Sequence, residues 1–554
     1  MRLDTFLHTL HFDTEKAIPL DFEVDWEDAP LPFKLYRGLP VIPLSAEIPL
    51  MLEERQAITK PDLREMSHFL WYVYGLTQFS ESVFDLNTME QVFGPIQSYR
   101  RFVPSGGARY PNEIYVYLKL EGAHTGIYHY DVAHQRLVLL RKGNFDDYMA
   151  RALGNRCDLS TCFATVFVTT MFWKNFFKYN NFAYRLQGLD AGVLIGQLLE
   201  VSKRFGYESG VYFQFLDRAL NHLLGLSEQE ESVYAVIPLS VEPGSTWFGK
   251  GNGANGSVTA AELCRELLTV EHDHYVRSQR VLPYPMLIQM TEASQLESLQ
   301  SFRRFEGEKN ITYEGNTVAL PQVGRFFYDL GSACRKRVSP EMGFVLGKVS
   351  QQQLATLLQE ATASFQYRND LDEDQENRQP RVFLYCCLYN VEDIPDGAYR
   401  YDSEAHTLRQ IRLGDHRLYL QQGMNLDNVN LFQVPLCFHV AGDKDHLKAA
   451  LGYRGYRIQQ MEAGMLVQRL LLAATALGMG GHPLLGYDVE SCDNLNRMDS
   501  HGKTSLIQIP VGPYRPRSRL EEFAWLGVNE KKQKVVETLL GNLFLSAYKG
   551  YKKL

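Results

Sequence analysis

Residues 100 to 111 form a segment whose composition suits the binding of a flat or anionic ligand. The segment reads RRFVPSGGARYP, so Pro104 leads into Ser105, Gly106 and Gly107. The serine supplies a hydroxyl group, and the two glycines leave their backbone amides open to close approach. A loop of this composition has a purely structural role about as often as it binds a ligand. It therefore predicts a binding site only together with other residues.

A second segment places an amine beside a phenol. It reads FFKYNNFAYR from residue 176 to residue 185 and puts Lys178 next to Tyr179 among aromatic residues. A lysine with a lowered pKa can take up a proton and a phenol can relay it, as general-base catalysis requires. On spacing alone, such a pair more often belongs to a solvated surface, so catalysis is a hypothesis at this point.

Two basic clusters occur in the C-terminal part of the chain. The first reads RKR at residues 335–337, and the second reads GPYRPR at residues 512–517. Guanidinium groups bind phosphate through paired hydrogen bonds, so either cluster could hold a phosphate, and ordinary surface charge is the alternative. A metal site is not expected, because His272 and His274 would point to different faces of a helix.

The chain contains an internal repeat. Four short motifs recur in the same order and at an almost constant spacing: GIYHYD at 126–131 and GAYRYD at 397–402, YRLQ at 184–187 and YRIQ at 456–459, AG at 191–192 and 463–464, and IP at 237–238 and 509–510. A constant spacing over such a distance indicates two copies of one domain of about 240 residues. We expect the two copies to pack as a fused dimer.

Each copy shows the same order of predicted elements: an alternating strand, the GxYxYD turn and strand, a long amphipathic helix and a closing strand. This order predicts an α+β fold. We assign residues 1–240 to an N-terminal domain and residues 321–554 to a C-terminal domain. Residues 241–320 form a partly helical linker, with helices expected near 259–270 and 292–302.

The composition narrows the class of protein. The chain has 554 residues, 45% of them hydrophobic and 22% charged, which excludes a disordered or disulfide-stapled protein. A net charge of −8 argues against a nucleic-acid surface. Eight scattered cysteines, no signal peptide and no apolar run of about 18 residues predict a soluble, cytoplasmic protein without a membrane anchor. Aromatic residues reach 12% and cluster around Lys178 in the first copy.

The combination of these motifs resembles one family. RRFVPSGGARYP, GxYxYD, KYxxxxYR, the Ala-Gly helix and the closing IP strand resemble the SagB/ThcOx-type azoline dehydrogenases of the FMN-dependent nitroreductase superfamily. The second copy resembles the same fold more loosely. One departure is that the usual arginine-arginine-serine-x-arginine run reads RKRVS at residues 335–339, which leaves open which side chain meets phosphate.

The resemblance implies that FMN is the cofactor and that peptide thiazolines or oxazolines are oxidised to thiazoles or oxazoles. It further implies that oxygen reoxidises the flavin and that a cyclodehydratase partner makes the azoline. Lys178 or Tyr179 would remove a proton while hydride passes to the flavin N5. The preferred assignment has Tyr179 near the substrate and Lys178 lowering its pKa, and the reverse assignment remains open.

The resemblance also implies a division of the cofactor site between the copies. The first copy would contribute Arg101, Pro104, Ser105, Gly106 and Gly107, and the second copy would contribute Arg335, Arg337, Gly486, Arg515 and Arg517. The second copy has Ala450 and Leu451 in place of the Lys-Tyr pair. The first copy has QFLD at residues 214–217 in place of the glycine turn. We therefore expect one complete FMN site per chain.

Two other functions remain open. The chain could be another flavin reductase on the same scaffold, acting on nitro compounds or quinones, or a non-catalytic scaffold of a peptide-modifying complex. The fused pseudo-dimer could also pair again as a homodimer.

Overall fold

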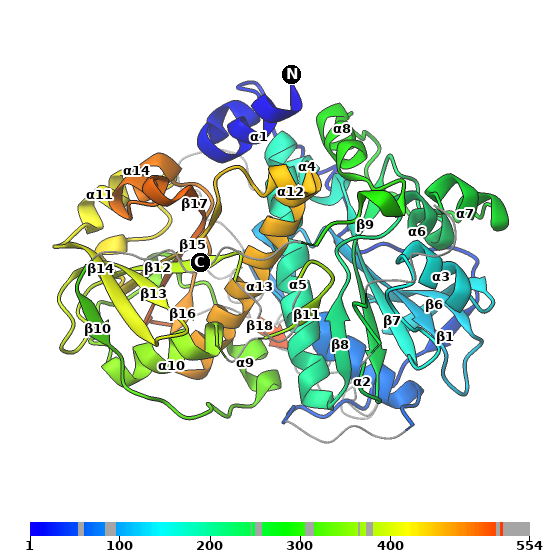
Figure 1. Ribbon diagram of the computed structural model, residues 1–554, viewed down its shortest axis with the longest axis horizontal. Helices are drawn as coiled ribbons and strands as arrows, with labels where there is room; N and C mark the ends of the chain where they lie inside the picture. The colour runs from blue at the N-terminus through cyan, green and yellow to red at the C-terminus, as the bar shows by residue number, and fades with distance from the viewer. Residues whose placement is uncertain are drawn as a thin grey trace, which may run out of the picture.

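The structure is a computed structural model that describes residues 1–53, 60–82, 96–244, 246–249, 258–304, 315–363, 366–372, 380–516 and 521–523. Two large sheets lie on opposite sides of a central pair of long helices, α5 (Ala183–Phe205) and α13 (Arg454–Ala476) (Figure 1). This arrangement confirms the predicted tandem α+β fold. Within the described ranges, no helix is long and apolar enough to cross a membrane.

The strands fall into three sheets. The first has the order β1 (Val41–Pro43), β6 (Arg136–Lys142), β5 (Gly126–Asp131), β4 (Asn112–Leu118), β7 (Ala164–Met171), β9 (Glu231–Ser240), β8 (Glu208–Val211) and β11 (Arg368–Asn369). The second has the order β10 (Thr317–Ala319), β14 (Thr407–Leu413), β13 (Gly397–Asp402), β12 (Phe383–Leu388), β15 (Leu436–Asp443), β17 (Lys503–Gly512) and β16 (Gly480–Gly481). A small sheet joins β18 (Glu521–Phe523), β2 (Leu76–Ser82) and β3 (Ile96–Arg101).

The central strands are covered on both faces. Along β4, Ile114 and Val116 belong to the core that includes the central helices, whereas Tyr115 and Tyr117 belong to a second core on the opposite face. Because side chains alternate along a strand, a strand buried on both faces needs apolar or paired residues at every position. This explains why aromatic residues recur in the strands of the repeat.

Shorter helices surround the sheets. They are α1 (Leu3–Phe12), η1 (Thr14–Ala17), α2 (Leu63–Tyr74), η2 (Gly106–Ala108), α3 (Asp146–Ala152), α4 (Trp173–Tyr179), η3 (Asn180–Phe182), α6 (Asp217–Leu224), α7 (Ala260–Glu266), α8 (Pro285–Ser294), η4 (Leu299–Ser301), α9 (Leu330–Lys336), η5 (Glu341–Gly343), α10 (Gln351–Ala361), α11 (Arg417–Gln422), η6 (Leu431–Gln433), α12 (Lys448–Leu451), α14 (Val489–Leu495) and η7 (Asp499–His501).

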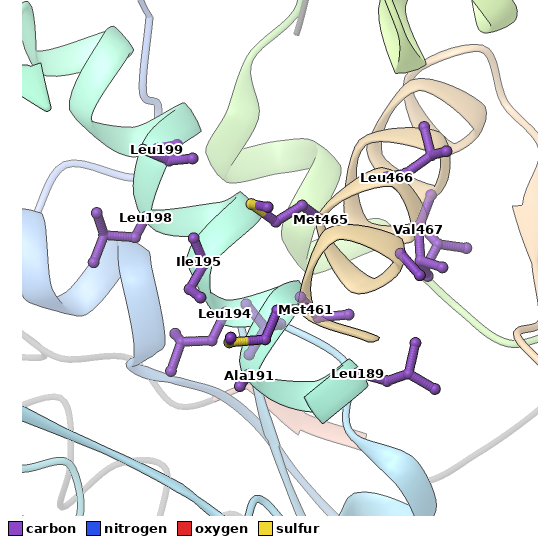
Figure 2. Close-up of a cluster of buried hydrophobic side chains, with 14 of the residues drawn as sticks. Leu189, Ala191, Leu194, Ile195, Leu198, Leu199, Met461, Met465, Leu466 and Val467 are labelled. Carbon is purple, nitrogen blue, oxygen red and sulfur yellow. The ribbon is translucent and has the colours of Figure 1, made fainter. Parts of the chain in front are cut away.

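The two copies meet where α5 crosses α13. A Cβ atom added to Gly192 would lie 2.0 Å from the Met461 carbonyl oxygen, and one added to Gly464 would lie 2.2 Å from the Leu189 carbonyl oxygen. These glycines are equivalents in the repeat, so each plays the same part in its own copy. Figure 2 shows the leucine and methionine side chains that close the surrounding core. The predicted fused dimer therefore has its pseudo-symmetry axis at this crossing.

The second copy also adds a strand to the first sheet. In the first sheet, β11 comes from the second copy and pairs in parallel with β8, with Arg368 opposite Gly210 and Asn369 opposite Val211. The next residue, Asp370, accepts hydrogen bonds from the backbone amides of Phe213 and Gln214 at 2.8 and 3.0 Å. The chain therefore links the two halves through backbone pairing as well as through helix packing.

The linker helices differ in position from the prediction. The first begins at Ala260, with Thr259 and Glu262 forming a capping box, but it ends at Glu266. The second spans Pro285–Ser294 rather than 292–302. Proline suits the first helical turn because it lacks the amide hydrogen that would remain unpaired there, and this signal marks the correct start.

Candidate functional site

The glycine loop of the first copy is held in an unusual backbone conformation. Gly107, Ala108 and Tyr110 have φ values of 58°, 55° and 49°. A non-glycine residue with positive φ costs roughly 1–2 kcal/mol, so this loop persists only because its surroundings fix it. The Ser105 hydroxyl accepts the Tyr110 amide at 2.8 Å, and the Tyr110 hydroxyl accepts the Arg101 amide at 3.1 Å.

Asp190 on the central helix α5 anchors the same loop. Its carboxylate accepts the Ser105 hydroxyl at 2.6 Å and the Gly106 amide at 3.1 Å. Burial raises the pKa of Asp190 to about 6, although these two hydrogen bonds act in the opposite direction. Our sequence prediction did not include Asp190. The repeat carried a signal, because Glu462 occupies the corresponding position in the second copy.

Helix α4 brings Lys178 and Tyr179 directly over the loop. A Cβ atom added to Gly107 would lie 2.2 Å from the Tyr179 hydroxyl oxygen and 2.7 Å from Lys178 Nζ, and the positive φ of Gly107 also favours glycine there. Burial, assisted by the positive charge of Arg109, lowers the pKa of Lys178. Burial, together with the negative charge of Asp190, raises the pKa of Tyr179 to about 12. The structure therefore brings together two motifs that lie far apart in the sequence.

The turn after this pair repeats in the second copy. Asn180 ends α4 with φ 47° and ψ −137°, and Gly452 ends α12 with φ 58° and ψ −149°. These two residues are also equivalents in the repeat. The first copy adopts with asparagine a conformation that the second copy adopts with glycine, so backbone strain is stored directly beside Lys178 and Tyr179.

The first basic cluster, from the second copy, contacts the strand that leads into this loop. The Arg337 carbonyl oxygen, at the end of α9, accepts a hydrogen bond from the Arg100 guanidinium, just before the loop. Burial and the nearby Arg100 lower the pKa of Arg337 to about 10. Within the described residues, Arg337 Nε and Arg335 Nη1 are buried without a hydrogen-bond partner. Buried guanidinium nitrogens without partners suit an anionic ligand.

The second basic cluster lies next to the segment that follows α9. The Arg515 amide donates to the Gly343 carbonyl oxygen at 2.9 Å, and Phe344 pairs with Tyr514. Arg515 is exposed. Arg517, the remaining predicted contact of this cluster, lies outside the described residues.

Arg101 and Gly486 are the remaining predicted cofactor residues. Arg101 is buried, and its guanidinium carbon lies 4.1 Å from the Tyr74 ring centroid and 4.7 Å from that of Tyr110. Like Arg337 Nε, Arg101 Nε and Nη1 are buried without a hydrogen-bond partner among the described residues. Gly486 accepts the Asn425 amide at 2.9 Å, and Asn425 Nδ2 donates to Thr14 on η1 at 3.3 Å. Since η1 contacts η3, this turn reaches the Lys-Tyr pair through the N-terminal segment.

Linker residues line the symmetry-related position, where a cavity of about 230 Å³ remains. In the repeat, Gln214 corresponds to Gly486, and its side chain accepts the Arg303 amide at 2.6 Å and donates to the Arg303 carbonyl oxygen at 2.7 Å. Asp217 accepts the Leu296 amide at 2.8 Å. The linker residues around 294–303 thus form hydrogen bonds with the polar groups of the corresponding turn in the first copy.

Comparisons with known proteins agree with this architecture. Residues 57–239 and 348–512 match the model of the nitroreductase family. A crystal structure from Anabaena variabilis with a nitroreductase designation superposes over 93% of this chain and 99% of its own, with a TM-score of 0.68 and 20% identity, and so supports the fold.

Two curated relatives match over shorter stretches. The trifolitoxin-processing protein TfxB of Rhizobium leguminosarum bv. trifolii is 29% identical over 25% of this chain and 39% of its own length. The Methanocaldococcus jannaschii protein MJ1384, designated a nitroreductase, is 29% identical over 18% of this chain and 48% of its own. The chain therefore spans less than half the length of these two relatives.

The paired α+β fold and the matching family model define the class of protein as flavin oxidoreductases. Because the family model covers well over half of the sequence, in two segments, the chain belongs to the nitroreductase family.

Proposed function

We propose that the protein is an FMN-dependent oxidase of peptide thiazolines and oxazolines. The observation that carries this proposal is the placement of Lys178 and Tyr179 over Gly107, in a loop that the second copy approaches with Arg337. The motifs resemble SagB/ThcOx-type azoline dehydrogenases, and one relative is named for toxin processing, which supports a peptide substrate.

The residues of this site fit FMN. Arg335 and Arg337 would hold the phosphate with guanidinium nitrogens that have no partner among the described residues, and Arg515 lies close to the same segment. The absence of a side chain at Gly107 lets Lys178 and Tyr179 approach the loop backbone closely. FMN, when bound, supplies a two-electron acceptor that oxygen can reoxidise.

The pKa directions favour one assignment of the catalytic pair. An azoline loses two hydrogens on oxidation, one of which leaves as a proton from the carbon next to the peptide carbonyl and the ring C=N. The lowered pKa of Lys178 lets its amine accept that proton more readily than an ordinary lysine. The raised pKa of Tyr179, about 12, keeps its hydroxyl protonated, so it can donate a hydrogen bond to the substrate. This reverses the preferred assignment from the sequence.

The contacts of the linker support one site per chain. In the first copy, Gln214 and Asp217 are hydrogen-bonded to linker residues. In the second copy, Ala450 and Leu451 replace the catalytic pair. A cyclodehydratase that makes the azoline is the partner that this reaction requires.

Two measurements test the proposal. The released flavin should be FMN at about one per chain, and two per chain would refute the single site. With a synthetic thiazoline peptide and oxygen, Lys178→Ala should lower kcat about 100-fold or more, and Tyr179→Phe should also lower it. The matched control is Lys448→Met on α12, whose exposed ion pair with Asp4 contributes little.

The outcomes separate the competing functions. Unchanged thiazoline oxidation in both Lys178→Ala and Tyr179→Phe would refute the catalytic assignment. Rapid NAD(P)H consumption with a nitro compound or quinone, but no azoline oxidation, would instead establish a flavin reductase. A purified protein that accepts no FMN would indicate a non-catalytic scaffold.

A further inference from the structure

An exposed tryptophan stands beside the proposed catalytic lysine. The Trp26 ring centroid lies 5.6 Å from Lys178 Nζ and 5.4 Å from the guanidinium carbon of Arg109. The same ring packs edge-on against the buried Phe177, with 5.6 Å between centroids. Trp26 nevertheless remains 50% exposed. Half of a large aromatic surface therefore faces solvent at the site.

A hydrogen-bonded turn fixes the backbone that carries Trp26. The Asp28 amide donates to the Asp25 carboxylate at 3.2 Å, which closes a turn around the tryptophan. The Asp28 carboxylate accepts the amides of Gln279 and Arg280 at 2.6 and 2.9 Å. These backbone hydrogen bonds lower the pKa of Asp28, so it remains an acceptor at neutral pH. The N-terminal segment is thereby attached to the linker.

The same attachment reaches the helix of the catalytic pair. The Ser278 hydroxyl donates to the Asp28 carbonyl oxygen at 2.8 Å and accepts the indole N–H of Trp173 at 2.9 Å. Trp173 is the first residue of α4, whose last two residues are Lys178 and Tyr179. A continuous chain of hydrogen bonds therefore joins the turn that carries Trp26 to the helix that carries Lys178, and it fixes their relative position.

We propose that Trp26 is a specificity-determining residue that stacks on the five-membered heterocycle of the peptide. This inference rests on the proposed function. A flat, unsaturated ring and the peptide plane joined to it match the flat surface of an indole, whereas an uncyclised cysteine side chain offers no such surface. The ring held against Trp26 lies within reach of Lys178. Trp26 thus selects cyclised over uncyclised segments.

The test uses product binding, so it does not depend on turnover. A peptide with one central thiazole and a red-emitting dye is titrated into FMN-loaded protein by fluorescence anisotropy, and the same peptide with uncyclised cysteine is the comparison. We expect Trp26→Ala to weaken thiazole-peptide binding about 10-fold and to leave cysteine-peptide binding and FMN content unchanged. Trp26→Phe should retain most of the affinity, because it keeps an aromatic face.

The matched control is Phe327→Ala. Phe327 is 69% exposed and has the Arg325 guanidinium carbon 5.0 Å from its ring centroid, so it resembles Trp26 in exposure and in its cation contact. Its removal should not change binding. Equal weakening of both peptides by Trp26→Ala, an effect below two-fold, or no thiazole binding by the wild type would overturn the inference. If the wild type binds the thiazole peptide through Trp26 but fails to oxidise the thiazoline, only the proposed function fails.

Discussion

Gly192→Ala tests whether the central helix crossing positions the site. The added Cβ would lie 2.0 Å from the Met461 carbonyl oxygen, whereas an ordinary contact is about 3.4 Å, so the helices must separate by roughly 1.4 Å. Overpacking of this kind costs about 1–3 kcal/mol, and a backbone atom cannot rotate away, which places the cost at the upper end. Alanine recovers about 1 kcal/mol of helix propensity. We expect a net loss of about 2 kcal/mol or more.

Gly196→Ala is the matched control on the same helix. Its added Cβ would lie 3.1 Å from Met465 Cα, which requires a shift of only a few tenths of an ångström. In urea denaturation followed by circular dichroism, the free energy of unfolding of Gly196→Ala should therefore be near that of the wild type, and that of Gly192→Ala should be well below it. Because Asp190 lies two residues before Gly192 and holds Ser105, Gly192→Ala should also retain less FMN. Equal stability of the two variants would refute the close crossing.

Three further predictions follow from particular contacts. Asn180→Gly should stabilise the protein by about 1 kcal/mol, and Gly452→Asn should destabilise it by a similar amount. An added Cβ at Gly452 meets nothing within 4 Å, so only backbone strain differs. Changes of the same sign in the free energy of unfolding of the two variants would contradict this prediction. Since the pKa of Asp190 is raised to about 6 from 3.8, the folded state binds its proton more tightly than the unfolded state. As pH rises from about 4 to above 6, the free energy of unfolding of the wild type should fall by on the order of 3 kcal/mol relative to that of Asp190→Asn. A difference between the two proteins that does not change with pH would refute this prediction. Asp217→Asn should destabilise the protein by about 3 kcal/mol, because the buried Arg454, 2.7 Å from Asp217, loses its counter-charge. An unchanged thermal unfolding temperature would contradict this prediction.

The sequence predicted the two-copy fold because the repeat leaves a local signature. The equivalent motifs of the two copies fall on β5 and β13, on α5 and α13, and on β9 and β17. Several of these motifs reflect short-range demands, such as a turn before a strand. Signals of this kind are readable from one segment at a time.

The sequence also indicated the residues of the candidate site, but not their roles. It marked Lys178, Tyr179 and the loop at Ser105 as separate possibilities, each with a structural alternative. It missed Trp26, because a tryptophan in an N-terminal segment carries no local pattern of function, and it missed Asp190 although Glu462 occupies the equivalent position in the repeat. Their importance depends on contacts with residues that are distant in the sequence, such as Ser105 for Asp190 and the linker for the turn at Trp26.

Taken alone, the sequence determined that this chain contains two related α+β domains, and that the Ser105 loop and the Lys178–Tyr179 pair occur in the first of them only. The tertiary structure decided that the pair lies against the loop, that the Arg337 carbonyl oxygen binds Arg100 just before the loop, and that linker residues bind the corresponding turn of the first copy. It also decided the direction in which the pKa values of Lys178 and Tyr179 move. The reason is physical: burial and the distance between charges are properties of the folded chain, and residue types and spacing do not contain them.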